Sequence, residues 1–302
     1  MRCECGHVHQ TLAEKIDADQ KALIDLRKQE KAQSGPLAKL TRARINQIRA
    51  EIAAEKQVSL ALGRSRQAII KALKSAVEVT DPSTLLRFNR DQLSQFLMQA
   101  GYADVVGDLT KATDKINEAA QKALEGIAPF DFVRIQDQAF MLQTSIAESV
   151  IDDVIIPNTI SAMRDSLQSL SVGVPINQVA SALNQRMKSA TGSQLTVLKT
   201  KISQYGRDIT AVAAREAGLD LFLFTGPVDG ITRPFCKPLV NLVVSRPQLN
   251  RLNNGQGLSV ISAGGGYNCR HSWSPITEGF VQSMGLTRAT TADIDQANGG
   301  AT

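Results

Sequence analysis

The feature that most constrains the fold of this chain is a proline-free run between Leu37 and Val77. Apolar side chains recur along it at the three- and four-residue spacing of an amphipathic helix, and Gly63 is its one weak helix former. The chain is 43% hydrophobic but only 4% aromatic, so its core must consist largely of Ala, Leu, Ile and Val. That composition favours packed helices over a β-sandwich. The sequence therefore predicts a protein built mainly from long helices.

Short segments rich in Pro and Gly divide the first two thirds of the chain into several helices. Asp81 or Thr80 is expected to cap the helix that starts at Pro82. Pro157 is expected to kink or split the helix that contains it, because proline removes a backbone donor. The predicted helices cover residues 10–33, 37–77, 82–101, 104–124, 131–171, 176–190 and 194–216.

The character of the chain changes at Leu219. Residues 219–225 alternate and are rich in apolar side chains, which is typical of a β-strand, and Gly and Asn become frequent after them. The predicted fold class is mainly α, with a long helical N-terminal region followed by a small α+β C-terminal module. The predicted domains are an N-terminal tail and first helix at 1–35, an elongated helical region at 36–216, the α+β module at 217–280 and a flexible C-terminal tail at 281–302.

The composition disfavours several classes of protein. No run of about 18 apolar residues is present, so we predict neither a transmembrane helix nor a membrane partner. The N-terminus lacks the apolar stretch of a secretory signal. Four Cys in 302 residues are too few for a disulfide-rich scaffold.

Positive charge is concentrated between Pro36 and Lys74, where nine Lys and Arg residues occur with only two Glu. Such a surface attracts phosphate groups or acidic protein surfaces. The alternative is an ordinary solvated helix face, because no aromatic residues are interleaved to stack on bases. The residues singled out for contact with double-stranded DNA or another polyanion are Lys39, Arg42, Arg44, Arg49, Arg64, Arg66, Lys71 and Lys74.

The N-terminus contains a candidate metal-binding pattern. An extended backbone would place four alternating side chains on one side, namely Cys3, Cys5, His7 and His9. Thiolate and imidazole are zinc ligands, but such tight spacing strains a tetrahedral site. The alternative is a tail that binds no metal.

Rare residues gather again near the C-terminus, in segments 228–236, 252–258 and 264–275. These segments hold two of the four Cys, one of the three His and the only Trp. A chain that concentrates rare residues in this way is fixing a specific small structure there. The motifs read Asp229-Gly-x-Thr-Arg233-Pro-x-Cys236, then Asn254-Gly-Gln-Gly-Leu258, then Gly265-Gly-Tyr-Asn268-Cys269-Arg270-His271-x-Trp273-x-Pro275.

Three of these residues are candidate metal ligands. Cys236, Cys269 and His271 offer zinc ligands from two loops, with Asp229 as a candidate fourth. The alternatives are a Cys236–Cys269 disulfide, or two buried thiols that only pack. The sequence assigns no cofactor, and zinc is one candidate.

The three motifs, in this order, resemble the C-terminal domain of the phage Mu F-like head morphogenesis proteins, which are minor capsid proteins of tailed phages. The resemblance covers residues 229–275, and the N-terminal helices carry no such match. It implies a virion protein that acts near the portal in head assembly, packaging or ejection of DNA, in several copies around a symmetric ring. It also implies the phage head as its location, with assembly in the host cytoplasm, where a disulfide is disfavoured.

No catalytic role is predicted. The chain has neither a recognisable nucleophile elbow nor a phosphate-binding glycine loop between a strand and a helix. We therefore expect a structural protein, with an internal DNA-binding protein as the alternative and an enzyme module as a more distant one.

A module with so few and such short strands needs something to close it. We predict that Cys236 and the Cys269–His271 loop lie within bridging or ligand distance. Arg233 and Arg270 are expected to hydrogen-bond Asp229 and loop carbonyls, with Asp229 and Arg233 meeting across their own loop, and contact of the two arginines with phosphate is the alternative. The residues of this module-closing motif are Asp229, Arg233, Cys236, Asn268, Cys269, Arg270, His271 and Trp273, the last as a core side chain.

Overall fold

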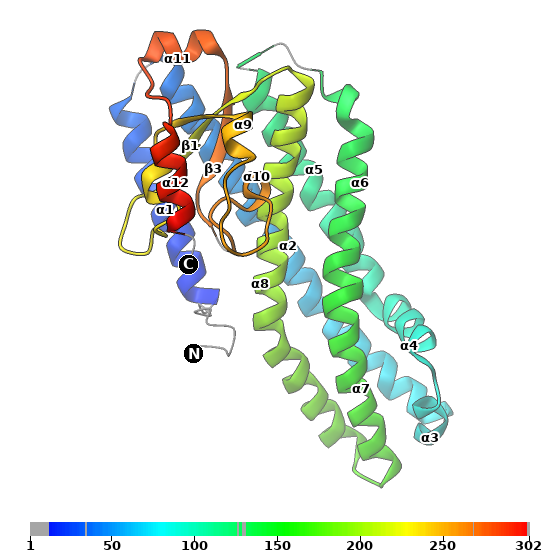
Figure 1. Ribbon diagram of the computed structural model, residues 1–302. Coiled ribbons are helices and arrows are strands. Elements are labelled where there is room, and N and C mark those ends of the chain that lie inside the picture. Colours follow the sequence, from blue (N-terminus) through cyan, green and yellow to red (C-terminus); the bar gives the residue numbers. More distant parts are fainter. Residues whose placement is uncertain (1–11, 34, 126, 129–130, 268, 301–302) are drawn as a thin grey trace. The chain divides into compact units, whose positions relative to one another are not determined.

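The computed structural model describes residues 12–33, 35–125, 127–128, 131–267 and 269–300 (Figure 1). It is 74% helical, and long helices are followed by a small three-stranded antiparallel sheet with short helices, so the predicted fold class is confirmed. The helices before the sheet are α1 (Leu12–Ala32), α2 (Gly35–Val79), α3 (Pro82–Leu86), α4 (Arg90–Leu97), η1 (Met98–Tyr102), α5 (Ala103–Glu125), η2 (Phe132–Ile135), α6 (Gln136–Ala147), η3 (Glu148–Ile155), α7 (Ile156–Ser171) and α8 (Ile176–Glu216).

The last third of the chain contains shorter elements. They are β1 (Leu221–Thr225), η4 (Lys237–Leu239), β2 (Val243–Ser245), α9 (Arg246–Leu249), α10 (Val260–Ala263), β3 (Ser272–Ile276), α11 (Glu278–Met284) and α12 (Thr291–Gly299). None of the helices in the described part of the chain is both long and apolar enough to cross a bilayer.

The chain forms two compact units, each assembled from separate stretches of sequence. Unit 1 comprises residues 1–52, 113–142 and 202–302, and unit 2 comprises residues 53–112 and 143–201. The division expected from the sequence is linear, whereas these units share helices α2, α5, α6 and α8, each of which contributes to both. The sheet and the C-terminal motifs belong entirely to unit 1.

Helix α2 is continuous through Gly63, as its apolar pattern predicts. Helix α8 is also continuous, so the prediction of two helices with a break near residues 191–193 is wrong. One internal glycine costs a helix only about 1 kcal/mol relative to Ala. Leu183 and Leu198 are buried on either side of the expected break, and each such side chain contributes about 1.5–3 kcal/mol. Burial therefore outweighs the local propensity for a break.

Pro157 changes the hydrogen-bond pattern of its helix without ending it. It lies in the first turn of α7, and the eight residues before that helix form the π-helix η3. The Ile156 amide, directly before Pro157, donates to the Ile151 carbonyl five residues back, which is the spacing of a π-helix. The predicted cap also forms, because the Asp81 side chain accepts a hydrogen bond from the Ser83 amide at 2.6 Å.

The sheet has the strand order β2-β1-β3, with β1 antiparallel to both neighbours. Both of its faces are buried. Phe222, Phe224 and Trp273 pack on one face with Ala213 and Ala214 of α8. On the other face, a second cluster consists of Leu40 from α2, Leu223, Val243, Ile276 and Val281 from α11. The short strands are thus held between helices, which gives the loops at their ends fixed positions.

The C-terminal segment differs from the flexible tail expected at 281–302. Helix α12 begins with a capping box between Thr290 and Asp293, and its Ile294 and Ala297 are fully buried in the core of unit 1. Asn298 accepts a hydrogen bond from the Asn253 amide at 2.8 Å. Two apolar residues at helical spacing are enough to dock a short, otherwise polar helix once it is capped.

Candidate functional site

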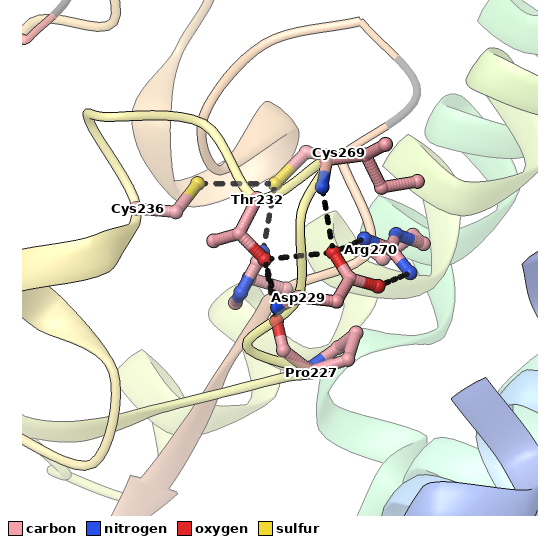
Figure 2. A network of polar contacts seen from close by, with 8 residues as sticks. Pro227, Asp229, Thr232, Cys236, Cys269 and Arg270 are labelled. Carbon is pink, nitrogen blue, oxygen red and sulfur yellow. Dashed lines mark hydrogen bonds and ion pairs between the residues drawn. The ribbon is translucent and has the colours of Figure 1, made fainter. Parts of the chain in front are cut away.

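The first and third C-terminal motifs meet at a buried cluster of two thiols and one imidazole. The Sγ atoms of Cys236 and Cys269 lie 3.7 Å apart (Figure 2). Cys269 Sγ also lies 3.7 Å from His271 Nδ1. The potential ligand atoms of all three residues lie within 4.8 Å of one another. The predicted approach of Cys236 to the Cys269–His271 loop is therefore confirmed.

Glycine residues make room for this cluster. A Cβ atom on Gly265 would lie 2.4 Å from Cys236 Sγ, and one on Gly226 would lie 2.4 Å from the His271 ring. Gly264 approaches Cys269 Sγ closely and has a φ of 56°, a conformation that favours glycine. The glycine-rich sequence thus lets the backbone wrap tightly around the sulfur atoms.

Negative charge at the cluster is favoured on Cys269. The Gly265 amide donates a hydrogen bond to Cys269 Sγ at 3.1 Å. The hydrogen bond between the thiols raises the pKa of Cys236, as does burial, and the same hydrogen bond lowers the pKa of Cys269. His271 and Arg207 lower the pKa of Cys269 further, against the effect of burial. The pair can therefore hold one thiolate and one thiol that donates to it.

His271 is almost fully buried between the sheet and the cluster. Its ring stacks on Phe224 with centroids 5.2 Å apart, and Phe224 in turn contacts Trp273 at 4.2 Å. The Nε2 atom of His271 is buried and has no hydrogen-bond partner among the described residues. Trp273 is a core side chain, as predicted, and its Nε1 donates to the Val260 carbonyl at 2.9 Å.

The aspartate of the first motif is held by the arginine of the third. Arg270 donates two hydrogen bonds to the Asp229 carboxylate, at 2.7 and 2.8 Å (Figure 2). This bidentate contact holds the pKa of Asp229 well below its usual range. The carboxylate also accepts from the Thr232 hydroxyl and the Ile231 amide, at 3.1 Å each. Through these hydrogen bonds the Asp229 carboxylate connects its own loop to the loop that carries Arg270.

The expected hydrogen bonds of Arg233 and Arg270 to Asp229 and to loop carbonyls are confirmed, but the expected meeting of Asp229 and Arg233 is wrong. Arg233 instead donates to the carbonyl oxygens of Gly265 and Tyr267, which lie on the third motif. Two arginines thus join the same pair of loops from opposite directions. Asp229 is not among the described residues whose potential ligand atoms gather at the cluster, and its oxygen atoms are engaged by Arg270 and Thr232.

Sequence reasoning missed two side chains that brace the site. Arg207 of α8 is buried and donates to the carbonyl oxygens of Ser262 and Cys269. Gln256 accepts from the Tyr267 amide at 2.8 Å. Gln256 lies inside a recognised motif, so its importance was detectable. Nothing in the sequence distinguishes Arg207 from the other arginines of the helices.

The basic residues of α2 do not form one free cationic surface. Arg44 is buried beside Glu51, with 3.6 Å between Nη1 and Oε1, so its predicted role in polyanion contact is wrong. Two further arginines are paired with carboxylates at 2.6 Å, namely Arg42 with Glu30 and Arg64 with Asp108. An ion pair within the chain competes with binding to phosphate.

The other basic residues of this set differ in exposure. Lys39, Arg49 and Lys71 are exposed, whereas Arg66 and Lys74 are half-buried. Lys74 donates to Asn177 at 3.1 Å. The proposed N-terminal metal ligands and one member of the module-closing motif lie outside the described residues, namely Cys3, Cys5, His7, His9 and Asn268.

The described chain therefore presents one chemically specialised site, a thiol–thiol–imidazole cluster at the joint of two loops in a helical protein. Such a cluster can bind a soft metal ion, form a disulfide, or pack as reduced thiols. Comparison of the chain with protein-family models, with curated proteins and with solved structures gives no match.

Proposed function

We propose that the protein is a structural minor capsid or head morphogenesis protein of a tailed phage, acting at or near the portal. One observation carries this proposal: the three motifs that resemble the Mu F-like family are joined into a single closed structure. The first and third motifs share the thiol cluster and the Asp229–Arg270 pair. The middle motif is bound to the third through Gln256 and Tyr267.

The side chains of these motifs serve mainly to hold loops together. Asp229, Arg233 and Arg270 are engaged with groups of the chain itself. Rigid loops presented by a buried sheet suit a role in binding another protein. Loops held in this way support a structural role in the virion rather than a catalytic one.

The same loops present apolar side chains to solvent. Val228 and Ile231, beside Asp229, are 66% and 60% exposed, and Tyr267 on the third motif is 44% exposed. Exposed apolar residues on fixed loops favour contact with a partner protein. We propose that this surface meets the portal or an adjoining head protein, and that several copies are arranged around a symmetric ring.

The proposal is tested by co-expression with the portal protein of the same phage. The wild-type chain is expected to co-purify with portal rings. The double variant Val228→Ser/Ile231→Ser is expected to weaken that binding by about tenfold or more, because buried apolar residues at an interface each contribute on the order of 1 kcal/mol or more. The matched control is Val172→Ser, which alters a residue of similar exposure in unit 2. Normal head assembly without this chain, together with no portal binding, contradicts the proposal.

A second candidate function is an internal virion protein that binds DNA. The exposed Lys39, Arg49 and Lys71 on α2 favour it, whereas the internal ion pairs of Arg42, Arg44 and Arg64 weaken it. Retention on duplex DNA should then fall steeply with salt, because each neutralised phosphate releases counterions. Binding that does not depend on salt, or no binding, eliminates this function.

A further inference from the structure

Two distances in the thiol cluster match the edges of a metal coordination tetrahedron. Zn–S bonds of about 2.3 Å at the tetrahedral angle place two sulfur atoms about 3.8 Å apart, and one sulfur and one imidazole nitrogen about 3.6 Å apart. In the cluster, the Cys236–Cys269 distance is 3.7 Å and the Cys269–His271 distance is 3.7 Å. Two of the three donor–donor distances are therefore close to those that zinc requires, and all three ligand atoms lie within 4.8 Å of one another.

The imidazole provides a second and independent argument. The buried His271 ring approaches Cys269 Sγ through Nδ1 and stacks on Phe224. Neither ring nitrogen has an oxygen partner among the described residues. A buried polar group normally has a hydrogen bond or a metal ligand bond. A metal ion between the two thiols would give Nδ1 a ligand bond in place of its contact with sulfur, and the buried Nε2 would remain without a partner among the described residues.

The surroundings suit a metal thiolate. The Gly265 amide donates to Cys269 Sγ, and backbone amides that point at sulfur stabilise its negative charge. Zinc with two thiolates and a neutral imidazole has no net charge, which lowers the cost of burying the ion. Asp229 is held by Arg270, so the described residues offer three ligands, and a fourth would come from water or from outside the described residues.

We propose that Cys236, Cys269 and His271 bind a zinc ion that closes the C-terminal module. Binding forms two Zn–S bonds and one Zn–N bond and releases the remaining thiol protons to solvent, with no change of oxidation state. The ion joins the loop before η4 to the loop before β3, two segments that the short strands do not connect to each other. This proposal is independent of the proposed role in the phage head.

The test uses the full-length protein, reduced, freed of metal with a chelator and then titrated with Zn²⁺ alone or Co²⁺ alone. The expected result is one tightly bound ion per chain. The Co²⁺ form should show the intense visible absorption of a tetrahedral site and a thiolate-to-cobalt charge-transfer band. Zn²⁺ should also raise the thermal unfolding midpoint of the wild type, because an ion that binds only the folded state stabilises it.

Two variants assign the ligands. Cys236→Ser and His271→Asn should each lose the bound ion or weaken its binding at least tenfold, while Cys3→Ser/Cys5→Ser, which removes the other two cysteines, should retain it. If the variants fail to fold, the titration of the wild type with Zn²⁺ or Co²⁺ still shows whether the chain binds a metal ion. Absence of binding by the reduced, folded wild type overturns the proposal. So does metal binding that Cys3→Ser/Cys5→Ser abolishes and Cys236→Ser leaves intact, or a Cys236–Cys269 disulfide that reforms in the presence of excess Zn²⁺.

Discussion

At the scale of single residues, the C-terminal module depends on a few polar side chains whose partners lie on another loop. Asp229 contacts Arg270, Arg233 contacts the backbone of the third motif, and Gln256 contacts Tyr267. The motif sequences identified most of these residues. They left open which arginine pairs with Asp229 and which with the loop carbonyls, because both Arg233 and Arg270 have the chemistry for either role. Only the folded path of the backbone decides between them.

The first prediction concerns the Asp229–Arg270 pair. Asp229→Asn should destabilise the module by about 2 kcal/mol, a typical value for hydrogen bonds to a charged group. Because the folded state lowers the pKa of Asp229, its contribution to stability is complete above the unfolded pKa of about 3.9 and is lost as pH falls below it. The stability difference between wild type and variant should therefore shrink as pH drops below about 4.

Trp273, the only tryptophan, is the probe for this measurement, because it is buried in the module. Urea unfolding followed by its fluorescence gives the stability of the module at each pH. Glu278→Gln is the matched control, since Glu278 is an exposed carboxylate paired with Arg288 on the surface. Equal effects of the two substitutions at neutral pH would contradict a special role for Asp229.

The second prediction concerns Gly265. Gly265→Ala should destabilise the module by about 1–3 kcal/mol, because the new Cβ would lie 2.4 Å from Cys236 Sγ in a tightly packed site. Gly279→Ala in helix α11 has open space around it and should be neutral or slightly stabilising. The midpoint of urea unfolding, followed by Trp273 fluorescence, is compared between the two variants. An unchanged midpoint for Gly265→Ala would show that the cluster is loosely packed.

At the scale of secondary-structure elements, periodic apolar patterns predicted helices such as α2 and the strand β1 well. The predictions failed where one local signal competed with burial elsewhere. A Thr-Gly-Ser sequence at residues 191–193 indicated a break, yet α8 continues because both flanking halves are anchored in cores. The polar C-terminal segment indicated a flexible tail, yet two buried residues dock α12. Both errors arose because contacts distant in sequence decide the local structure.

The third prediction concerns helix α12. Ile294 is fully buried in the same cluster as Phe235 and Trp273. Ile294→Ala should therefore cost about 2–5 kcal/mol, as expected for truncating a large side chain in a core. The exposed Gln296→Ala on the same helix should change stability by no more than about 0.5 kcal/mol. A small effect of Ile294→Ala on the Trp273 transition would show that α12 is not part of the module.

At the scale of the whole molecule, the sequence predicted a linear order of helical region and module. The chain instead forms two units that each draw on separate stretches, with α2, α5, α6 and α8 contributing to both. That arrangement depends on which helix faces pack together, and amphipathic patterns alone do not specify the partner of each face. The module likewise includes residues of α8, such as Ala213, Ala214 and the bracing Arg207.

The last prediction concerns which parts of the chain are destabilised when the thiol cluster is lost. Cys236→Ser should destabilise unit 1, because it removes the side chain that joins the two loops, whereas unit 2 contains none of the cluster's residues. Far-UV circular dichroism should show almost unchanged helical content under native conditions. Hydrogen exchange should speed up around β3 and η4, while α7 in unit 2, with its buried Leu167, keeps its protection.

Leu167→Ala is the matched control and should give the opposite pattern. If Cys236→Ser accelerated exchange equally in α7 and β3, the two units would unfold as one, and the cluster would stabilise the whole chain rather than the module alone.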